Sequence, residues 1–144
     1  MKKKWILTIV WLASFVLCLC LVESFFYFKN GDGIPFLLSD DRVAAWRPVR
    51  NLYFPYLSGV LAFWFIRPFP PAKTLQAGKR RFTLAICCTL LFNVIVLFII
   101  SQVYWNYQEG TNAIENINDA VTMAAWFSFV VAPVNAFYFG GSSS

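Results

Sequence analysis

The sequence predicts an all-α integral membrane protein, in which four transmembrane helices form an antiparallel bundle and both termini lie in the cytoplasm. Composition points to this class: of 144 residues, 59% are hydrophobic and 13% are charged, against about 45–50% and about 25% in an ordinary soluble domain. The apolar residues also fall into four blocks that occupy most of the chain. We therefore expect one transmembrane domain over residues 1–139, with spans at about 5–28, 51–66, 82–105 and 120–139.

The first block follows three lysines and holds no charged residue from Trp5 to Val22. A secretory signal peptide also begins with basic residues, but its apolar region is only about 7–15 residues long. An uncleaved first span is therefore the favoured interpretation, and a signal peptide is the alternative. Beyond it, Ser39, Asp40 and Asp41 belong to the residue types that cap helix N-termini. They predict a short interfacial helix in the first outer loop.

The second block is short, because only residues 51–66 separate Arg50 from Arg67. At ~1.5 Å per residue, this block is about 24 Å long, less than the ~30 Å of a bilayer core. Arginine side chains that extend toward the membrane surface, or a helix that begins near Pro48, would make up the difference. The third block is uncharged from Phe82 to Gln108 and is long enough for a span.

The fourth block carries a small residue at every fourth position. Asp119 is the expected N-cap of this span, and Pro133 is expected to kink it because proline lacks an amide donor. In lipid, small side chains four residues apart let a second helix approach closely. A strict spacing of four turns by about 40° per step, so the set divides between two surfaces. The six residues are Ala120, Ala124, Ser128, Ala132, Ala136 and Gly140. The last two are expected to contact a further helix.

Charge predicts the orientation. Eight of the 12 basic residues lie in residues 1–4 and 67–81, and all seven acids lie at the opposite ends of the blocks. The positive-inside rule places the basic side in the cytoplasm, here of a plasma membrane, most simply a bacterial inner membrane. Five basic residues between the second and third spans are candidates for contact with anionic lipid headgroups or an acidic partner: Arg67, Lys73, Lys79, Arg80 and Arg81.

Three polar residues are the candidates for a transport or coupling role. Glu23 is the one acid inside an apolar block, and such a carboxylate either couples transport or forms an ion pair, here with Arg42, Arg47 or Arg50. Asn93 and Ser128 are expected at matching depth on antiparallel helices, as are Thr89 and Asn135. These pairs would either bond the two helices together or line a polar path.

Other chemistry finds little support in the sequence. The chain has no histidine, which removes the commonest general base and the commonest metal ligand. Cys18 and Cys20 are expected in the opposite leaflet from Cys87 and Cys88, so the two pairs cannot bridge. We expect no metal and no cofactor. The positive charge is attributed to membrane orientation, so no nucleic-acid partner is expected.

These observations favour a non-catalytic membrane module that forms a homo-oligomer or is a subunit of a larger membrane complex, and that anchors or gates a cytosolic partner. A small transporter or channel using Glu23, Asn93 and Asn135 is the alternative, and a lipid-modifying enzyme is the third interpretation. Residues 140–144 are a Gly/Ser segment, which is typical of a flexible linker to a cytosolic domain or of a tag. The sequence leaves both open.

Overall fold

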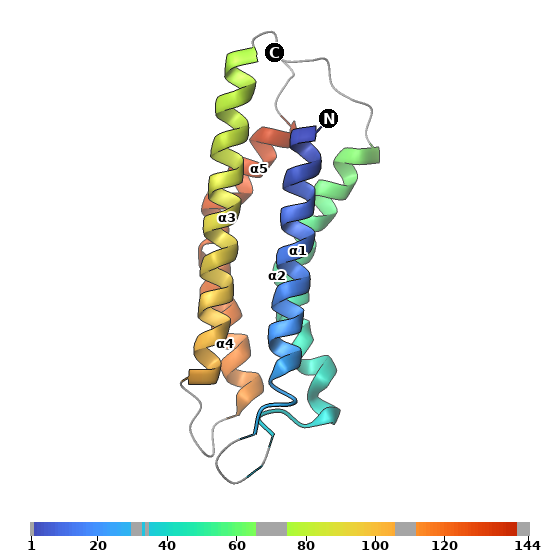
Figure 1. Ribbon diagram of the computed structural model, residues 1–144, viewed down its shortest axis with the longest axis vertical. Coiled ribbons are helices and arrows are strands. Elements are labelled where there is room, and N and C mark those ends of the chain that lie inside the picture. Colours follow the sequence, from blue (N-terminus) through green and yellow to red (C-terminus); the bar gives the residue numbers. More distant parts are fainter. Residues whose placement is uncertain (1, 30–32, 34, 66–74, 106–111, 141–144) are drawn as a thin grey trace.

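The computed structural model describes all residues except 1, 30–32, 34, 66–74, 106–111 and 141–144 (Figure 1). For residues 2–4, 39, 63–65, 75–81 and 135–140 it describes the backbone alone. Within the described part the chain is all-helical, which confirms the all-α part of the predicted class. The elements are α1 (Lys2–Ser24), a short 3₁₀ helix η1 (Ser39–Asp41), α2 (Arg42–Phe65), α3 (Leu75–Trp105), α4 (Ala113–Trp126) and α5 (Ser128–Gly140).

The long helices lie side by side. Helix α1 packs against α2 and α3, α4 packs against α3 and α2, and α5 packs mainly against α3. The order around the molecule is therefore α1, α2, the α4–α5 pair and α3. The start of α1 and the end of α5 lie at the same end of the molecule (Figure 1). Buried side chains fill the interior along its length, among them Leu7, Trp11, Tyr53, Phe92, Ile100 and Ile117.

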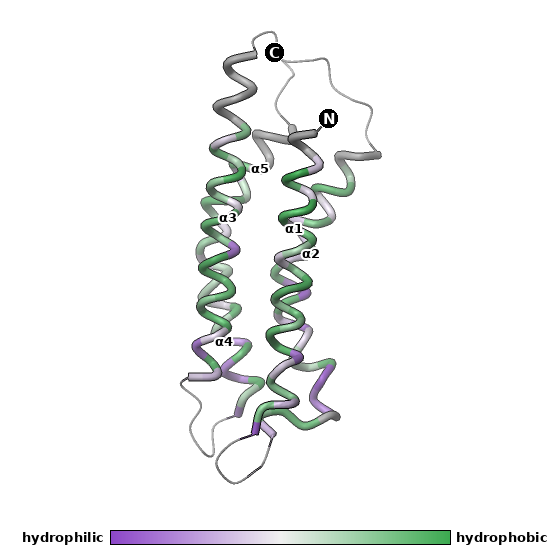
Figure 2. The backbone as a smooth tube through the Cα atoms, in the orientation of Figure 1, coloured by the Kyte–Doolittle hydropathy of each residue, from purple (hydrophilic) through white to green (hydrophobic). Residues whose placement is uncertain are grey.

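Two helices are long and apolar enough to cross a membrane, over Trp5–Ser24 of α1 and Phe82–Trp105 of α3. The α4–α5 pair would be a third such segment if it is taken as one bent span. Hydrophilic residues gather at the end of the molecule where α1 ends and α2 and α4 begin (Figure 2). This distribution and the two apolar helices are consistent with a membrane protein.

The end of α1 differs from the expected span, which continued to about residue 28. The helix ends at Ser24, whose hydroxyl donates to the carbonyl of Leu21 at 2.6 Å. A serine that bonds back to the preceding turn competes with the helical pattern. The next amides, of Phe25 and Phe26, bond only three residues back, at 3.1 Å each, to Val22 and Glu23. The chain therefore tightens into a turn at this point.

The prediction of a separate interfacial helix in the first outer loop is wrong. Residues Arg42–Phe65 form one continuous helix, with Pro48 and Pro55 inside it. Ala45, Val49 and Leu52 are buried three or four residues apart, so one apolar stripe continues across the expected boundary at residue 50. This stripe keeps the two segments in one helix.

The fourth segment also differs from expectation in its start and its bend. Helix α4 begins six residues before the expected cap Asp119, because Asn112 is the cap and its side-chain oxygen accepts the amide of Ile114 at 3.0 Å. The bend lies at Phe127, where α4 and α5 meet at 48°, and not at Pro133, which lies inside α5. The Tyr56 hydroxyl of α2 donates to the Ser128 carbonyl at 3.4 Å. A side chain that bonds into the backbone ladder in this way is a known cause of a bend.

The basic residues Lys79, Arg80 and Arg81 lie on the first turns of α3 and not in a loop, since this helix begins at Leu75. Their side chains lie outside the described residues, and Arg67 and Lys73 lie outside them entirely. Their expected contact with anionic lipid stays a prediction.

Replacing a small residue by leucine should distinguish the inward from the outward side of the α4–α5 pair. Ala124 is fully buried and Ala132 is exposed. We expect Ala124→Leu to destabilise the fold by about 1–3 kcal/mol, because a larger side chain must displace neighbours. In the monomer, Ala132→Leu should change the free energy of unfolding by less than about 0.5 kcal/mol. Denaturant titration in mild detergent followed by circular dichroism measures both, at a protein concentration low enough for the chain to be monomeric, and equal losses would contradict this packing.

Candidate functional site

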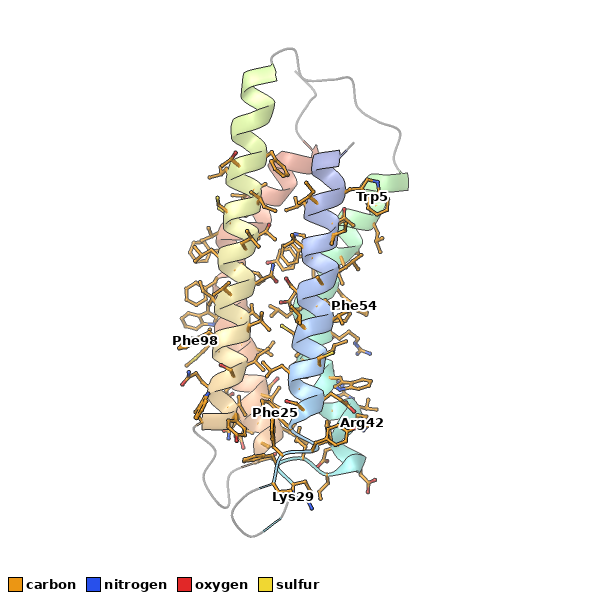
Figure 3. All side chains as sticks on the ribbon, viewed as in Figure 1. Trp5, Phe25, Lys29, Arg42, Phe54 and Phe98 are labelled. Atoms are coloured by element: carbon orange, nitrogen blue, oxygen red, sulfur yellow. The ribbon has the colours of Figure 1, made fainter. Side chains whose placement is uncertain are left out.

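Two groups of interacting side chains connect the helices in the described part of the chain. The first, which we call the central cluster, joins α1, α2 and α3 and consists of Trp11, Cys18, Tyr53, Tyr56, Thr89, Phe92 and Asn93. The second is an ion pair between Glu23 and Arg42, near one end of the molecule (Figure 3). Among the described residues, no group of three or more His, Cys, Asp or Glu side chains is arranged to hold a metal ion.

Hydrogen bonds in the central cluster form a chain with a defined direction. The Tyr53 hydroxyl donates to the side-chain oxygen of Asn93 at 2.8 Å, and the Asn93 amide nitrogen donates to the Thr89 carbonyl at 2.8 Å. The Cys18 sulfur lies 3.2 Å from the Tyr53 oxygen. A tyrosine hydroxyl has one proton, which Asn93 already accepts, so Cys18 is the donor to Tyr53. All three side chains are buried.

Asn93 therefore bonds to α2 and not to Ser128 as the sequence suggested. Ser128 instead takes part through its carbonyl, which accepts from Tyr56. Tyr53 was missed in the sequence because an aromatic residue in an apolar block is interpreted first as a packing residue. One signal was available, since a buried tyrosine hydroxyl requires a partner and Asn93 is an amide acceptor near the middle of the neighbouring block. Asn135 lies outside the described side chains, so its pairing with Thr89 stays a prediction.

Trp11 occupies the middle of the central cluster. Its ring stacks on Tyr56 at 4.5 Å and 11°, meets Tyr53 edge-on at 6.0 Å, and lies 5.8 Å from Phe92. Its indole nitrogen is buried and has no hydrogen-bond partner among the described residues. Leaving such a donor unpaired costs about 1–3 kcal/mol, so the aromatic contacts must offset that loss. The ring serves to join three helices.

The second group connects the end of α1 with the start of α2. Arg42 donates to Glu23 at 2.8 Å, so among the three arginines suggested by the sequence the structure selects Arg42. The Arg42 guanidinium also lies over the Phe26 ring at 5.3 Å. The two side chains are 27% and 44% exposed, so the pair contributes at most about 1 kcal/mol. The second Glu23 oxygen and the Arg42 Nε atom are buried, and no described residue bonds to either.

The small residues of the fourth segment divide between the interior and the surface. Ala120 and Ala124 are buried, Ser128 is half-buried and Ala132 is exposed. For Ala136 and Gly140 the structure describes the backbone alone. Within the described part, the first two therefore pack inside the chain and Ala132 faces away from it.

Removing the Tyr53 hydroxyl tests the central cluster. Tyr53→Phe leaves Asn93 and Cys18 without their partner, and we expect a loss of about 1–3 kcal/mol in the free energy of unfolding. The exposed Tyr27 offers the matched control, and Tyr27→Phe should have no measurable effect. A double-mutant cycle with Asn93→Ala should show a coupling of about 0.5–2 kcal/mol. Additive effects of Tyr53→Phe and Asn93→Ala would contradict the direct bond.

Comparisons with protein-family models, with curated proteins and with solved structures find no match for this chain. Two features of the molecule bear on its function: the bonded polar groups of the interior and the side chains that the fold leaves on its surface.

Proposed function

We propose that the chain is a non-catalytic, multi-pass membrane module that associates with a second copy of itself and so anchors or gates a cytosolic partner. In this proposal α1, α2, α3 and the bent α4–α5 pair are four passes of an antiparallel bundle in a bacterial inner membrane. Both termini lie in the cytoplasm. One observation carries the non-catalytic part: Tyr53, Asn93 and Cys18 are engaged with one another, so their polar groups join helices.

The four passes are supported by the helix lengths and by the ring order. Helix α2 has 24 residues, which corresponds to about 36 Å at ~1.5 Å per residue and is enough for a ~30 Å core. Helix α2 packs against α1, which is apolar enough to cross a membrane, and against α4. The same fold buries α2 residues Tyr53 and Val49 completely. A helix fixed so closely to α1 is expected to cross with it.

Self-association is supported by the outward side of the α4–α5 pair. Met123, Trp126 and Phe129 are 63%, 76% and 74% exposed, and Ala132 is exposed close to them in sequence. A two-fold axis along the membrane normal would bring α5 against the same helix of a second copy. Small side chains there would allow the two backbones to approach closely, while large side chains beside them provide the contact area.

The oligomeric state tests the proposal. We expect the purified full chain to sediment as a dimer in mild detergent, and Ala132→Leu to shift it toward monomer by about tenfold in the dissociation constant, because the larger side chain holds the helices apart. Ala62→Leu, an equally exposed alanine on α2, is the matched control and should leave the dimer unchanged. A chain that stays monomeric at all concentrations, and with no helical membrane partner after mild solubilisation, would contradict the proposal.

Transport remains the second candidate, and one observation favours it. The free Glu23 oxygen and the Arg42 Nε atom are buried polar groups that a passing ion or polar solute would satisfy. This alternative predicts cation or proton flux into liposomes that contain the chain, and loss of that flux in Glu23→Gln. Liposomes that stay tight under a proton or cation gradient would exclude it and leave the module as proposed.

A further inference from the structure

Helix α2 has a long outward face that changes in character along its length. Every residue of this face is exposed, at spacings of three or four that place them on one side of the helix. They are Arg47, Arg50, Asn51, Phe54, Pro55, Ser58, Gly59 and Ala62. The face begins with two cations and an amide and ends with small residues. Phe54 is 51% exposed and its ring meets that of Phe15 of α1 edge-on at 6.1 Å, and it lies well removed from Arg42 along the molecule (Figure 3).

The two arginines lack an acidic partner among the described residues. The ion pair that α2 makes is between Arg42 and Glu23. Arg50 instead has its guanidinium over the Phe54 ring at 5.8 Å. Such an arrangement retains the positive charge and leaves the N–H donors of the guanidinium available for an anion.

Arg50 also lies alongside the apolar part of α1. Tyr53, one turn beyond Arg50, bonds to Cys18, and Cys18 precedes the end of α1 at Ser24 by six residues. The three residues from Arg50 to Tyr53 correspond to about 4.5 Å along α2, and six residues of α1 correspond to about 9 Å. The Arg50 backbone therefore lies inside the end of the apolar stretch, where an unpaired cation is unfavourable unless an anion reaches it.

The second half of the face is smooth and open. A Cβ atom at Gly59 would meet no atom within 4 Å, so no described part of the chain covers this position. The Ser58 hydroxyl already donates to the Pro55 carbonyl at 3.0 Å and does not require an outside partner. The distance from Arg50 to Ala62 along the helix is about 18 Å, close to the ~15 Å of one hydrocarbon leaflet.

We propose that this face of α2 binds one anionic phospholipid, with its phosphate on Arg47, Arg50 and Asn51 and an acyl chain along Pro55, Gly59 and Ala62. The guanidinium fork matches a phosphate diester in charge and in hydrogen-bond geometry. The bound phosphate compensates the arginines that make α2 less apolar than α1 and α3. The proposal rests on the membrane placement of the proposed function, but not on self-association.

Native mass spectrometry of the detergent-purified full chain with added phosphatidylglycerol tests the site. Neutralising one arginine near an anionic headgroup should weaken binding about fivefold, so Arg47→Gln with Arg50→Gln should weaken it about 25-fold. Lys29→Gln removes an equally exposed charge away from this face and should weaken it less than about twofold. Phosphatidylcholine should bind more weakly than phosphatidylglycerol to the unmodified chain, since it carries no net negative charge.

Gly59→Leu tests the acyl part without changing the charge. Because a side chain at Gly59 meets open space, this variant should fold as the unmodified chain does and bind phosphatidylglycerol several-fold more weakly. Unchanged binding in the double arginine variant, or an equal loss in Lys29→Gln, would overturn the site. Extraction of the chain from membranes by alkaline carbonate would instead overturn the membrane placement, so the two failures are distinguishable.

Discussion

The hydrogen bond between Tyr53 and Asn93 is the interaction on which the arrangement of the helices depends most. It joins α2 to α3 across the middle of the molecule at 2.8 Å, and Cys18 of α1 completes the chain. In lipid, apolar contact between helices is little better than apolar contact with acyl chains, so directional bonds and close packing decide which helices are neighbours. Trp11 packs against both of the other helices beside this bond. These contacts hold α1, α2 and α3 together, and the α4–α5 pair packs against α2 and α3.

The all-α class could be predicted from the sequence because it depends on hydrophobicity and charge, which can be summed over each segment without knowing which segments are in contact. The lack of charge from Phe82 onward predicted the third helix, and the apolar stretch Phe82–Trp105 lies within α3. The ion pair of Glu23 was anticipated for a similar reason, since an acid at the end of one helix requires a cation in the next connection. The structure identifies Arg42 as that cation.

The bends and the pairing could not be predicted in this way, because they depend on contacts between segments far apart in the sequence. Pro133 was a local signal for a kink, whereas the bend lies at Phe127, beside the carbonyl to which Tyr56 of α2 bonds. Asn93 was paired with Ser128 because the two residues were expected at the same depth in the membrane. In the structure, Tyr53 of α2 donates to Asn93 instead. In both cases the partner is a tyrosine of α2, Tyr53 or Tyr56, and the sequence does not show how far or in which direction its side chain extends. The expected bounds of α2 were also wrong, since the helix begins at Arg42.

The proposed function requires α2, despite its arginines, to cross the membrane beside α1. Labelling with a membrane-impermeant maleimide in right-side-out vesicles tests this crossing through Lys29→Cys, Gln76→Cys and Glu115→Cys, with the unmodified chain as the control for its own cysteines. We expect labelling at Lys29→Cys and Glu115→Cys in sealed vesicles, and at Gln76→Cys only after the vesicles are opened. Labelling of Lys29→Cys and Gln76→Cys from the same side would contradict it, because α2 would then not cross.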